Sequence, residues 1–134
     1  MTDLVFFYGT LMSGFKRPGR TRVDLALEAV GHGWIRAILF DLGIYPAAIP
    51  ADEGRVRGEV HRMLDSGPVL LMLDEIEGYR QAQPDASLYV RRETPVTLDD
   101  GRTADAWVYF YNAPLGRAQR IESGDYLEYL RVKR

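Results

Sequence analysis

The strongest constraint on the fold is a turn signal between two strand-like runs in the second half of the chain. The runs are residues 88–98, LYVRRETPVTL, and 104–111, ADAWVYFY, both rich in β-branched and aromatic residues. Residues 99–102 between them read DDGR, and an Asp-Gly pair is typical of tight hairpin turns, because glycine adopts positive φ without steric cost. These runs predict an antiparallel hairpin. Pro95 has no N–H to donate, which indicates an edge or a bulge in the first strand.

The rest of the chain alternates between further strand and helix patterns. Strands are expected at 4–8, 34–42, 47–50 (a short edge strand) and 55–64, and helices at 23–30, 66–79 and about 120–131. The segment 13–22 is the most loop-like. We therefore expect an α+β fold in a single domain, residues 1–134, with a small mixed β-barrel of five to seven strands and two or three helices at its rim.

The strand expected at 55–64, RVRGEVHRML, alternates in polarity. Val56 and Val60 fall on one face, and Glu59 and His61 fall on the other. This pattern predicts a half-buried strand, with His61 pointing to solvent or lining the mouth of a cavity.

The best-defined helix is SGPVLLMLDEIEGY, residues 66–79. Ser66 can cap its start, Pro68 suits the first turn, and Gly78 can end it in a left-handed conformation. At about 100° per residue, one face collects Val69, Leu70, Leu73 and Ile76.

Glu77 is the acid that this helix directs toward the interior, because it lies four positions after Leu73 on the apolar face. Glu75 points nearly the opposite way, and Asp74 lies at the border. Burial and the negative end of the helix dipole should raise the pKa of Glu77, which suits a group that takes and returns a proton near neutrality. The simpler alternative is a structural glutamate bonded to backbone groups or reaching water.

A second candidate feature is the exit of the first strand, at Gly9, Thr10 and Leu11. A strand that stops at glycine and opens into a loop leaves backbone N–H groups without ladder partners, and a ligand can approach them closely. Such groups can cradle an anion or an oxyanion. An ordinary strand-to-loop turn explains the same residues equally well.

Composition excludes several classes of function. The 134 residues are 46% hydrophobic and 27% charged, as in an ordinary globular protein, and a formal net charge of −2 gives no reason to expect nucleic acid or an anionic membrane. No apolar run approaches the roughly 20 residues of a membrane span. The absence of cysteine excludes thiol nucleophiles and disulfides. The start, MTDLVFFYGT, lacks the pattern of a secretory signal, so a cytoplasmic location is expected.

No metal or cofactor is expected either. His32 and His61 lie outside any metal-binding spacing, and the chain has no dinucleotide-binding or phosphate-binding glycine motif and no serine nucleophile elbow. The basic groups are spread along the chain and balanced by acids, so they are interpreted as solvated faces: Arg55, Arg57, Arg91, Arg92 and the terminal RVKR.

Several stretches together resemble the γ-glutamylcyclotransferase family, including its smaller γ-glutamylamine-cyclising branch. They are FFYGTLMSG, FDLGIYPA, VRGEVHRM, LDEIEGY, LYVRR and AWVYFYN, in the order of the family and over nearly the whole chain. The resemblance implies a small mixed barrel with a pocket at one end. It also implies that backbone groups of Tyr8, Gly9, Thr10 and Leu11 hold the glutamyl moiety, that Glu77 is the acid/base, and that Tyr89 and Tyr109 line the pocket. The chain departs from the pattern after Leu11, where GFKRPGR replaces an Asn-His pair.

The function implied is a cofactor-free cyclotransferase that acts on a γ-glutamyl amide and releases 5-oxoproline and a free amine. The α-amino group of such a substrate is its own nucleophile, which agrees with the missing Cys and Ser motifs. A non-catalytic binding or regulatory protein on the same scaffold is the alternative, and a structural domain acting through its C-terminal helix is a third. The expected partner is a small molecule only, and the expected state is a monomer or weak homodimer.

Overall fold

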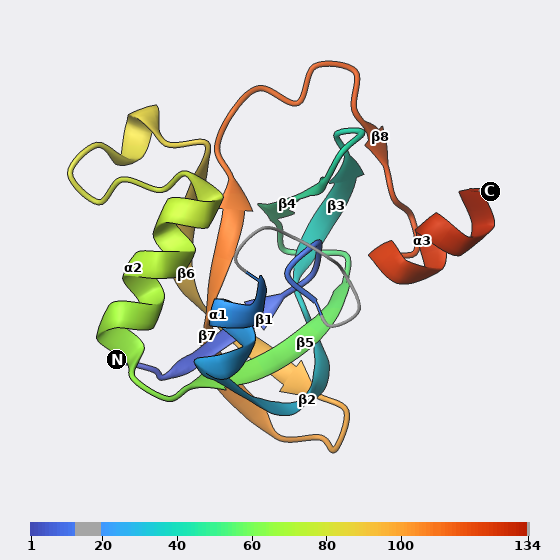
Figure 1. Ribbon diagram of the computed structural model, residues 1–134. Coiled ribbons are helices and arrows are strands. Elements are labelled where there is room, and N and C mark those ends of the chain that lie inside the picture. The colour runs from blue at the N-terminus through green and yellow to red at the C-terminus, as the bar shows by residue number, and fades with distance from the viewer. Residues whose placement is uncertain (13–19, 134) are drawn as a thin grey trace.

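A computed structural model describes residues 1–12 and 20–133 (Figure 1). The strands are β1 Leu4–Phe7, β2 Leu27–Ile35, β3 Ala37–Asp41, β4 Pro46–Pro50, β5 Val56–Met63, β6 Tyr89–Leu98, β7 Thr103–Tyr111 and β8 Gln119–Arg120. The α-helices are α1 Arg20–Leu25, α2 Ser66–Glu77 and α3 Tyr126–Lys133, and a short 3₁₀ turn spans Pro84–Ala86. Most of the expected loop 13–22 lies outside the described residues.

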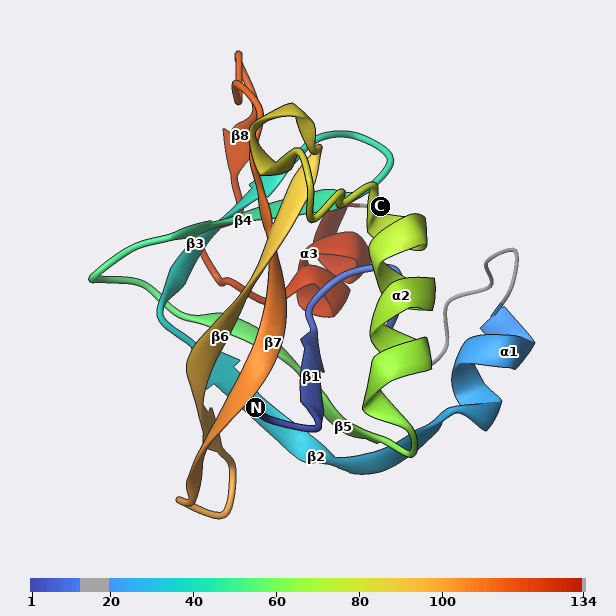
Figure 2. The ribbon, with the colours of Figure 1, turned by 90° about the vertical axis from the view of Figure 1, so that its left-hand side faces the viewer.

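Five strands close into a barrel in the order β1-β5-β2-β6-β7 (Figure 2). All neighbours are antiparallel except β1 and β7, which close the barrel in parallel at Val5 and Trp107. The expected hairpin is confirmed, since β6 pairs with β7 from Tyr89 to Thr97 and Gly101 in the turn has φ 92°. Strand β2 pairs with β6 only at Thr97 and Leu98, so Pro95 has a strand partner on one side, β7, and none on the other. The mixed barrel with helices around it is the expected fold.

A second sheet, in the order β4-β3-β8, stands beside the barrel. Strand β4 lies at its edge, as expected. The strand predicted at 34–42 is two strands, because the chain leaves the barrel after Ile35 and enters the second sheet at Ala37. The C-terminal helix begins at Tyr126, later than predicted. Arg120 pairs with Phe40, and the Ile121 N–H donates to the Leu39 carbonyl oxygen, so this segment lies along β3 instead of coiling.

The helix predicted at 23–30 is wrong. Helix α1 ends at Leu25, and the following residues form β2, which pairs antiparallel with β5 from Leu27 to Ile35. Further along β2, a Cβ on Gly33 would lie 2.5 Å from the Thr97 carbonyl oxygen on β6, so the two strands pack closely there. Pairing in the barrel overrides a helical pattern of only two turns.

Strand β5 is buried on both faces, whereas the sequence predicted one solvated face. Val56 and Val60 are in the core as expected, but Glu59 and His61 are buried as well. The His61 Nε2 atom lies 3.0 Å from Glu59 Oε1, and its ring centroid lies 5.3 Å from that of Phe7. The Glu59 and His61 side chains are therefore hydrogen-bond partners of each other inside the protein.

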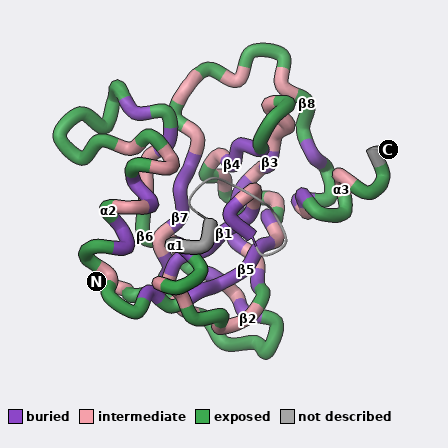
Figure 3. Tube along the Cα trace, viewed as in Figure 1, coloured by how far each residue is buried: buried purple, intermediate pink, exposed green. Residues whose placement is uncertain are grey.

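The core runs through the barrel and continues beneath α2 and the second sheet (Figure 3). Its largest fully buried side chains are Val5, Phe6, Val23, Ile35, Leu39, Val56, Val60, Leu73, Val96 and Val108. Helix α2 lies along the outside of the barrel and buries Val69, Leu70 and Leu73. Among the described residues, no helix is long and apolar enough to cross a membrane.

Candidate active site

Helix α2 brings Glu77 to one end of the barrel. Its N-cap is Asp65 rather than the expected Ser66, and Asp65 makes no side-chain capping bond. Gly78 ends the helix in the predicted left-handed conformation, with φ 70°. The next N–H, that of Tyr79, donates to the Asp74 carbonyl oxygen at 2.8 Å. The helix therefore ends in a defined turn directly after Glu77.

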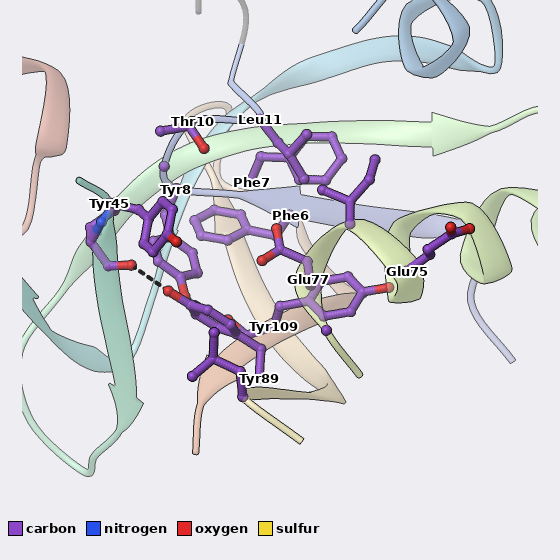
Figure 4. Close-up of a pocket in the computed structure, with 15 residues that line it drawn as sticks. Phe6, Phe7, Tyr8, Thr10, Leu11, Tyr45, Glu75, Glu77, Tyr89 and Tyr109 are labelled. Carbon is purple, nitrogen blue, oxygen red and sulfur yellow. Dashed lines mark hydrogen bonds between the residues drawn. The ribbon is translucent and has the colours of Figure 1, made fainter. Parts of the chain in front are cut away.

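The three acids of this helix end differ in burial. Glu77 is partly buried, and Figure 4 shows its carboxyl pointing into a pocket, whereas the Glu75 carboxyl points away from it. Asp74 is the most buried of the three, at 5% exposed, so the expectation that only Glu77 turns inward is wrong. Asp74 can be buried because the Arg91 guanidinium pairs with it and the Tyr109 hydroxyl donates to it.

Arg91 is therefore not part of a solvated face. Its Nε lies 2.8 Å from Asp74 Oδ1, and its side chain is 8% exposed. The guanidinium carbon lies 4.5 Å from the centre of the Trp107 ring and 5.4 Å from that of Tyr79. Cationic and aromatic groups attract at such distances, which helps Arg91 to be buried.

The loop after β1 forms another wall of the pocket with Tyr8, Gly9, Thr10 and Leu11. The Met12 N–H donates to the Gly9 carbonyl oxygen at 3.0 Å, which closes a tight turn. A Cβ on Gly9 would lie 2.8 Å from Pro46 Cγ. The lack of a side chain at Gly9 thus lets the β3–β4 hairpin pack against this loop. The sequence had suggested a different reason, close approach of a ligand.

Two of the predicted tyrosines join the barrel to the second sheet. The Tyr8 hydroxyl donates to the Tyr109 carbonyl oxygen at 2.5 Å and accepts from the Ala48 N–H at 3.3 Å. The Tyr89 hydroxyl donates to the Pro46 carbonyl oxygen at 3.0 Å (Figure 4). These hydrogen bonds join the segments that form the pocket wall, and each of the two hydroxyl groups donates its proton to a backbone carbonyl oxygen.

The phenols of Tyr8 and Tyr109 stay neutral. Burial raises the pKa of Tyr8 well above its ordinary value, and the nearby Tyr89 and Glu77 add to the shift. Burial also raises the pKa of Tyr109, with the hydrogen bond to Asp74 and the charges of Asp74 and Glu77 as further causes. Glu77 is thus close enough to both phenols for its charge to affect them.

All seven residues predicted from the sequence line one pocket of about 170 Å³. Residues that the sequence reading missed complete the lining: Phe6, Phe7, Tyr45, Pro46, Glu75, Ile76, Gly78 and Leu88. All eight lie in the stretches quoted above, FFYGTLMSG, FDLGIYPA, LDEIEGY and LYVRR, so the motifs contained a signal for each of them. In the part of the chain that the structure describes, no three His, Asp or Glu side chains are placed to hold a metal ion.

A closed five-stranded barrel with a pocket at one end, into which a helix-terminal glutamate points, defines the class of protein. Residues 5–128 match the γ-glutamyl cyclotransferase, AIG2-like family, and the chain belongs to this family. A relative in Methanocaldococcus jannaschii, MJ1514, named as a candidate γ-glutamylcyclotransferase, is 28% identical over 95% of this chain and 98% of its own length. The γ-glutamylcyclotransferase family protein YtfP of Escherichia coli is 34% identical over 67% of each chain.

Solved structures agree with this assignment. The crystal structure of YkqA from Bacillus subtilis matches with a TM-score of 0.74 at 26% identity, over 99% of this chain and 42% of that one. This chain therefore spans less than half of YkqA. The solution structure of E. coli YtfP matches with a TM-score of 0.67 at 31% identity, over 94% and 97% of the two chains. A structure titled γ-glutamyl cyclotransferase shares the fold alone, with a TM-score of 0.57 at 17% identity, over 90% of this chain and 70% of that one.

Proposed function

We propose that the protein is a cofactor-free cyclotransferase that converts a γ-glutamyl amide into 5-oxoproline and a free amine. The substrate's α-amino nitrogen attacks its own γ-carbonyl carbon, a carbon–nitrogen bond forms to close a five-membered ring, and the bond to the amide nitrogen breaks. Of the three protons of the α-ammonium group, one stays on the ring nitrogen and two leave with the departing amine. No water and no second substrate are consumed.

The observation that carries this proposal is the shared pocket of Glu77 and the loop after β1. The Glu77 carboxyl points into the space that Tyr8, Gly9, Thr10 and Leu11 also line. A cavity of about 150 Å³ accommodates a molecule the size of benzene. The pocket, at about 170 Å³, suits a glutamyl group with its leaving group toward solvent.

Glu77 is the proposed acid/base. The α-amine is mostly protonated at neutral pH and must lose a proton before it attacks, so a carboxylate beside it serves as the base. The same carboxyl can return this proton to the departing nitrogen and then pass on the second proton in the same way, so it ends the cycle ionised, as it began. Because the substrate's own α-amine attacks, the proposed reaction needs no protein nucleophile, which agrees with the absence of cysteine.

The loop after β1 and the tyrosines are proposed to bind and orient the substrate. Backbone groups of Gly9, Thr10 and Leu11 would hold the glutamyl moiety in a curled conformation and support the developing oxyanion. Tyr8, Tyr89 and Tyr109 would form the wall against which it curls. The Tyr8 hydroxyl already donates to the Tyr109 carbonyl oxygen and the Tyr109 hydroxyl to Asp74, which supports a wall rather than a proton-transfer role for these two.

Glu77→Gln tests the proposal, with Glu75→Gln as the matched control. Both changes remove one carboxylate from the same helix end. Glu75 borders the pocket, but it is exposed and its carboxyl points away, whereas the Glu77 carboxyl points into the pocket. Release of 5-oxoproline from a panel of γ-glutamyl amides should fall about 10²–10⁴-fold in Glu77→Gln. It should stay within about twofold of the wild-type rate in Glu75→Gln. Undiminished turnover in Glu77→Gln would reject the assignment.

The alternative, a binding or regulatory protein on the same scaffold, makes a different prediction. The wild-type protein would bind 5-oxoproline or L-glutamate, measured by calorimetry, yet release no product from any member of the panel. That result would replace the enzyme proposal and keep the pocket assignment.

A further inference from the structure

A buried ion pair lies one helical turn before Glu77. The Asp74 and Arg91 side chains are 7% and 8% exposed, with 2.8 Å between Asp74 Oδ1 and Arg91 Nε. Buried pairs of this kind add little net stability, because the cost of taking both charges out of water offsets their attraction. Stability alone therefore gives a weak reason for this pair.

The ion pair lies where three elements meet, with Asp74 on α2, Arg91 on β6 and further contacts from β7. Arg91 comes from β6, and the hydroxyl of Tyr109 on β7 donates to Asp74 Oδ1 at 2.6 Å. The Arg91 guanidinium also lies against the rings of Trp107 on β7 and of Tyr79, the second residue after α2. The Asp74 side chain thereby attaches the last turn of α2 to two barrel strands.

This attachment bears directly on the pocket. Asp74 and Glu77 are three positions apart, so they are neighbours on one surface of the helix. The Tyr109 ring lines the pocket, while its hydroxyl is bonded to Asp74 behind it. Asp74 and Arg91 do not line the pocket themselves. The ion pair thus lies outside the pocket lining. It is connected to the lining by the hydrogen bond from Tyr109 to Asp74, and by the helix that carries both Asp74 and Glu77.

From this arrangement we infer that Asp74 and Arg91 are positioning residues. They hold the Glu77 carboxyl and the Tyr109 ring in the places where each contacts the substrate. The inference rests on the proposed function. Proton transfer requires its acid/base within hydrogen-bond reach of the reacting nitrogen, so a small displacement of the helix end lowers the rate. The Arg91 charge also balances that of Asp74, so the second carboxylate adds no net negative charge beside Glu77.

The test is the double variant Asp74→Leu/Arg91→Met, which removes both charges and keeps side chains of similar size. Replacing a buried pair by apolar side chains is often neutral or stabilising, so cooperative urea unfolding should persist. We expect kcat to fall about tenfold or more with KM within about threefold, because the substrate still binds but meets a misplaced acid/base. A folded double variant with a wild-type kcat would overturn the inference.

Two further variants sharpen the comparison. Arg57→Gln/Asp99→Asn removes a bidentate ion pair near the β6–β7 turn, in which the two Arg57 nitrogens lie 2.6 and 2.5 Å from the Asp99 carboxylate oxygens. This pair lies outside the pocket lining, so kcat should stay within about twofold of the wild-type value. Tyr109→Phe keeps the ring and removes the hydroxyl, so it measures how much of the loss passes through Tyr109.

If the double variant does not fold, Arg91→Lys decides the question. Lysine keeps the charge beside Asp74 but loses the planar group that lies near the Trp107 and Tyr79 rings. A loss in kcat of about threefold or more at unchanged KM supports positioning, and an unchanged kcat rejects it.

Failure of the proposed function would be seen separately, as a wild-type protein that releases no 5-oxoproline. The readout is then calorimetric affinity for L-glutamate, whose ammonium group would meet the Glu77 carboxylate. Positioning predicts that Glu77→Gln and the double variant weaken binding by a similar factor of about two to three, as small as the KM change expected of the double variant. Wild-type affinity in either variant, or no binding by the wild-type protein, would overturn the inference.

Discussion

The Tyr8 hydroxyl donates a 2.5 Å hydrogen bond to the carbonyl oxygen of Tyr109, which lies 101 positions later in the chain. The same hydroxyl accepts from the Ala48 N–H on β4. One phenol at the exit of β1 thus connects the last barrel strand to the second sheet. The pocket wall is assembled from segments that are far apart in sequence, and its shape depends on bonds of this kind.

Loss of the Tyr8 hydroxyl should destabilise the protein. In Tyr8→Phe the Tyr109 carbonyl oxygen and the Ala48 N–H lose a buried partner, so the free energy of unfolding should fall by about 1–3 kcal/mol in a urea titration. Tyr45→Phe is the control, because the Tyr45 side chain belongs to the same pocket but the residue is 38% exposed. It should change stability by no more than about 0.5 kcal/mol. Equal effects of the two changes would contradict the role of the Tyr8 hydroxyl.

Stability should also fall steeply at alkaline pH. A tyrosine in the unfolded chain loses its proton near pH 10, whereas burial keeps Tyr8 and Tyr109 protonated in the folded state. The unfolded state then binds fewer protons than the native state, so the free energy of unfolding decreases as pH rises above that value. The slope is about 1.4 kcal/mol per pH unit for each such tyrosine. Urea titrations between pH 9 and 11 measure it, and Tyr8→Phe should have the shallower slope.

Gly9→Ala should disturb the pocket. Its new Cβ would lie 2.8 Å from Pro46 Cγ, so the loop and the β3–β4 hairpin must separate, at a cost of about 1–3 kcal/mol in stability. Under the proposed function KM should rise, since the loop contacts the glutamyl group. Gly67→Ala in the first turn of α2 meets no atom within 4 Å and should be neutral or stabilising by up to about 1 kcal/mol. A destabilised Gly67→Ala alongside an unaffected Gly9→Ala would contradict this reading.

The packing of α2 on the barrel depends on Leu73. This side chain is fully buried, and its truncation in Leu73→Ala should cost about 2–5 kcal/mol in the free energy of unfolding. Leu71 lies on the same helix and is 66% exposed, so Leu71→Ala should cost no more than about 0.5 kcal/mol. Chemical denaturation of the two variants checks the assignment of the buried face, and comparable losses would refute it.

The elements that were predicted correctly are those encoded by neighbouring residues. The Asp-Gly turn specifies the β6–β7 hairpin, and Gly78 ends α2 where the apolar pattern ends. Turn chemistry and helical periodicity act over a few residues, so they can be read without knowing what packs against them. The inward direction of Glu77 follows from the same periodicity.

Apart from the N-cap of α2, which is Asp65 instead of Ser66, the errors concern segments whose state depends on distant partners. Residues 27–30 form a strand because β5 pairs with them, although their local pattern fits a helix. Asp74 and Arg91, placed by the sequence at a border and on a solvated face, are buried because they meet each other and the ring of Trp107. A charge can be buried only where a partner is supplied, and the partner is 17 positions away.

By itself the sequence determined the hairpin, the amphipathic helix and an acid directed inward at the helix end, since these depend on local spacing. Only the tertiary structure decided that this acid shares a cavity with the exit of β1, which residues complete the wall, and which charges stand behind it. Closing the barrel brings β1 beside β7, and no local pattern encodes that contact.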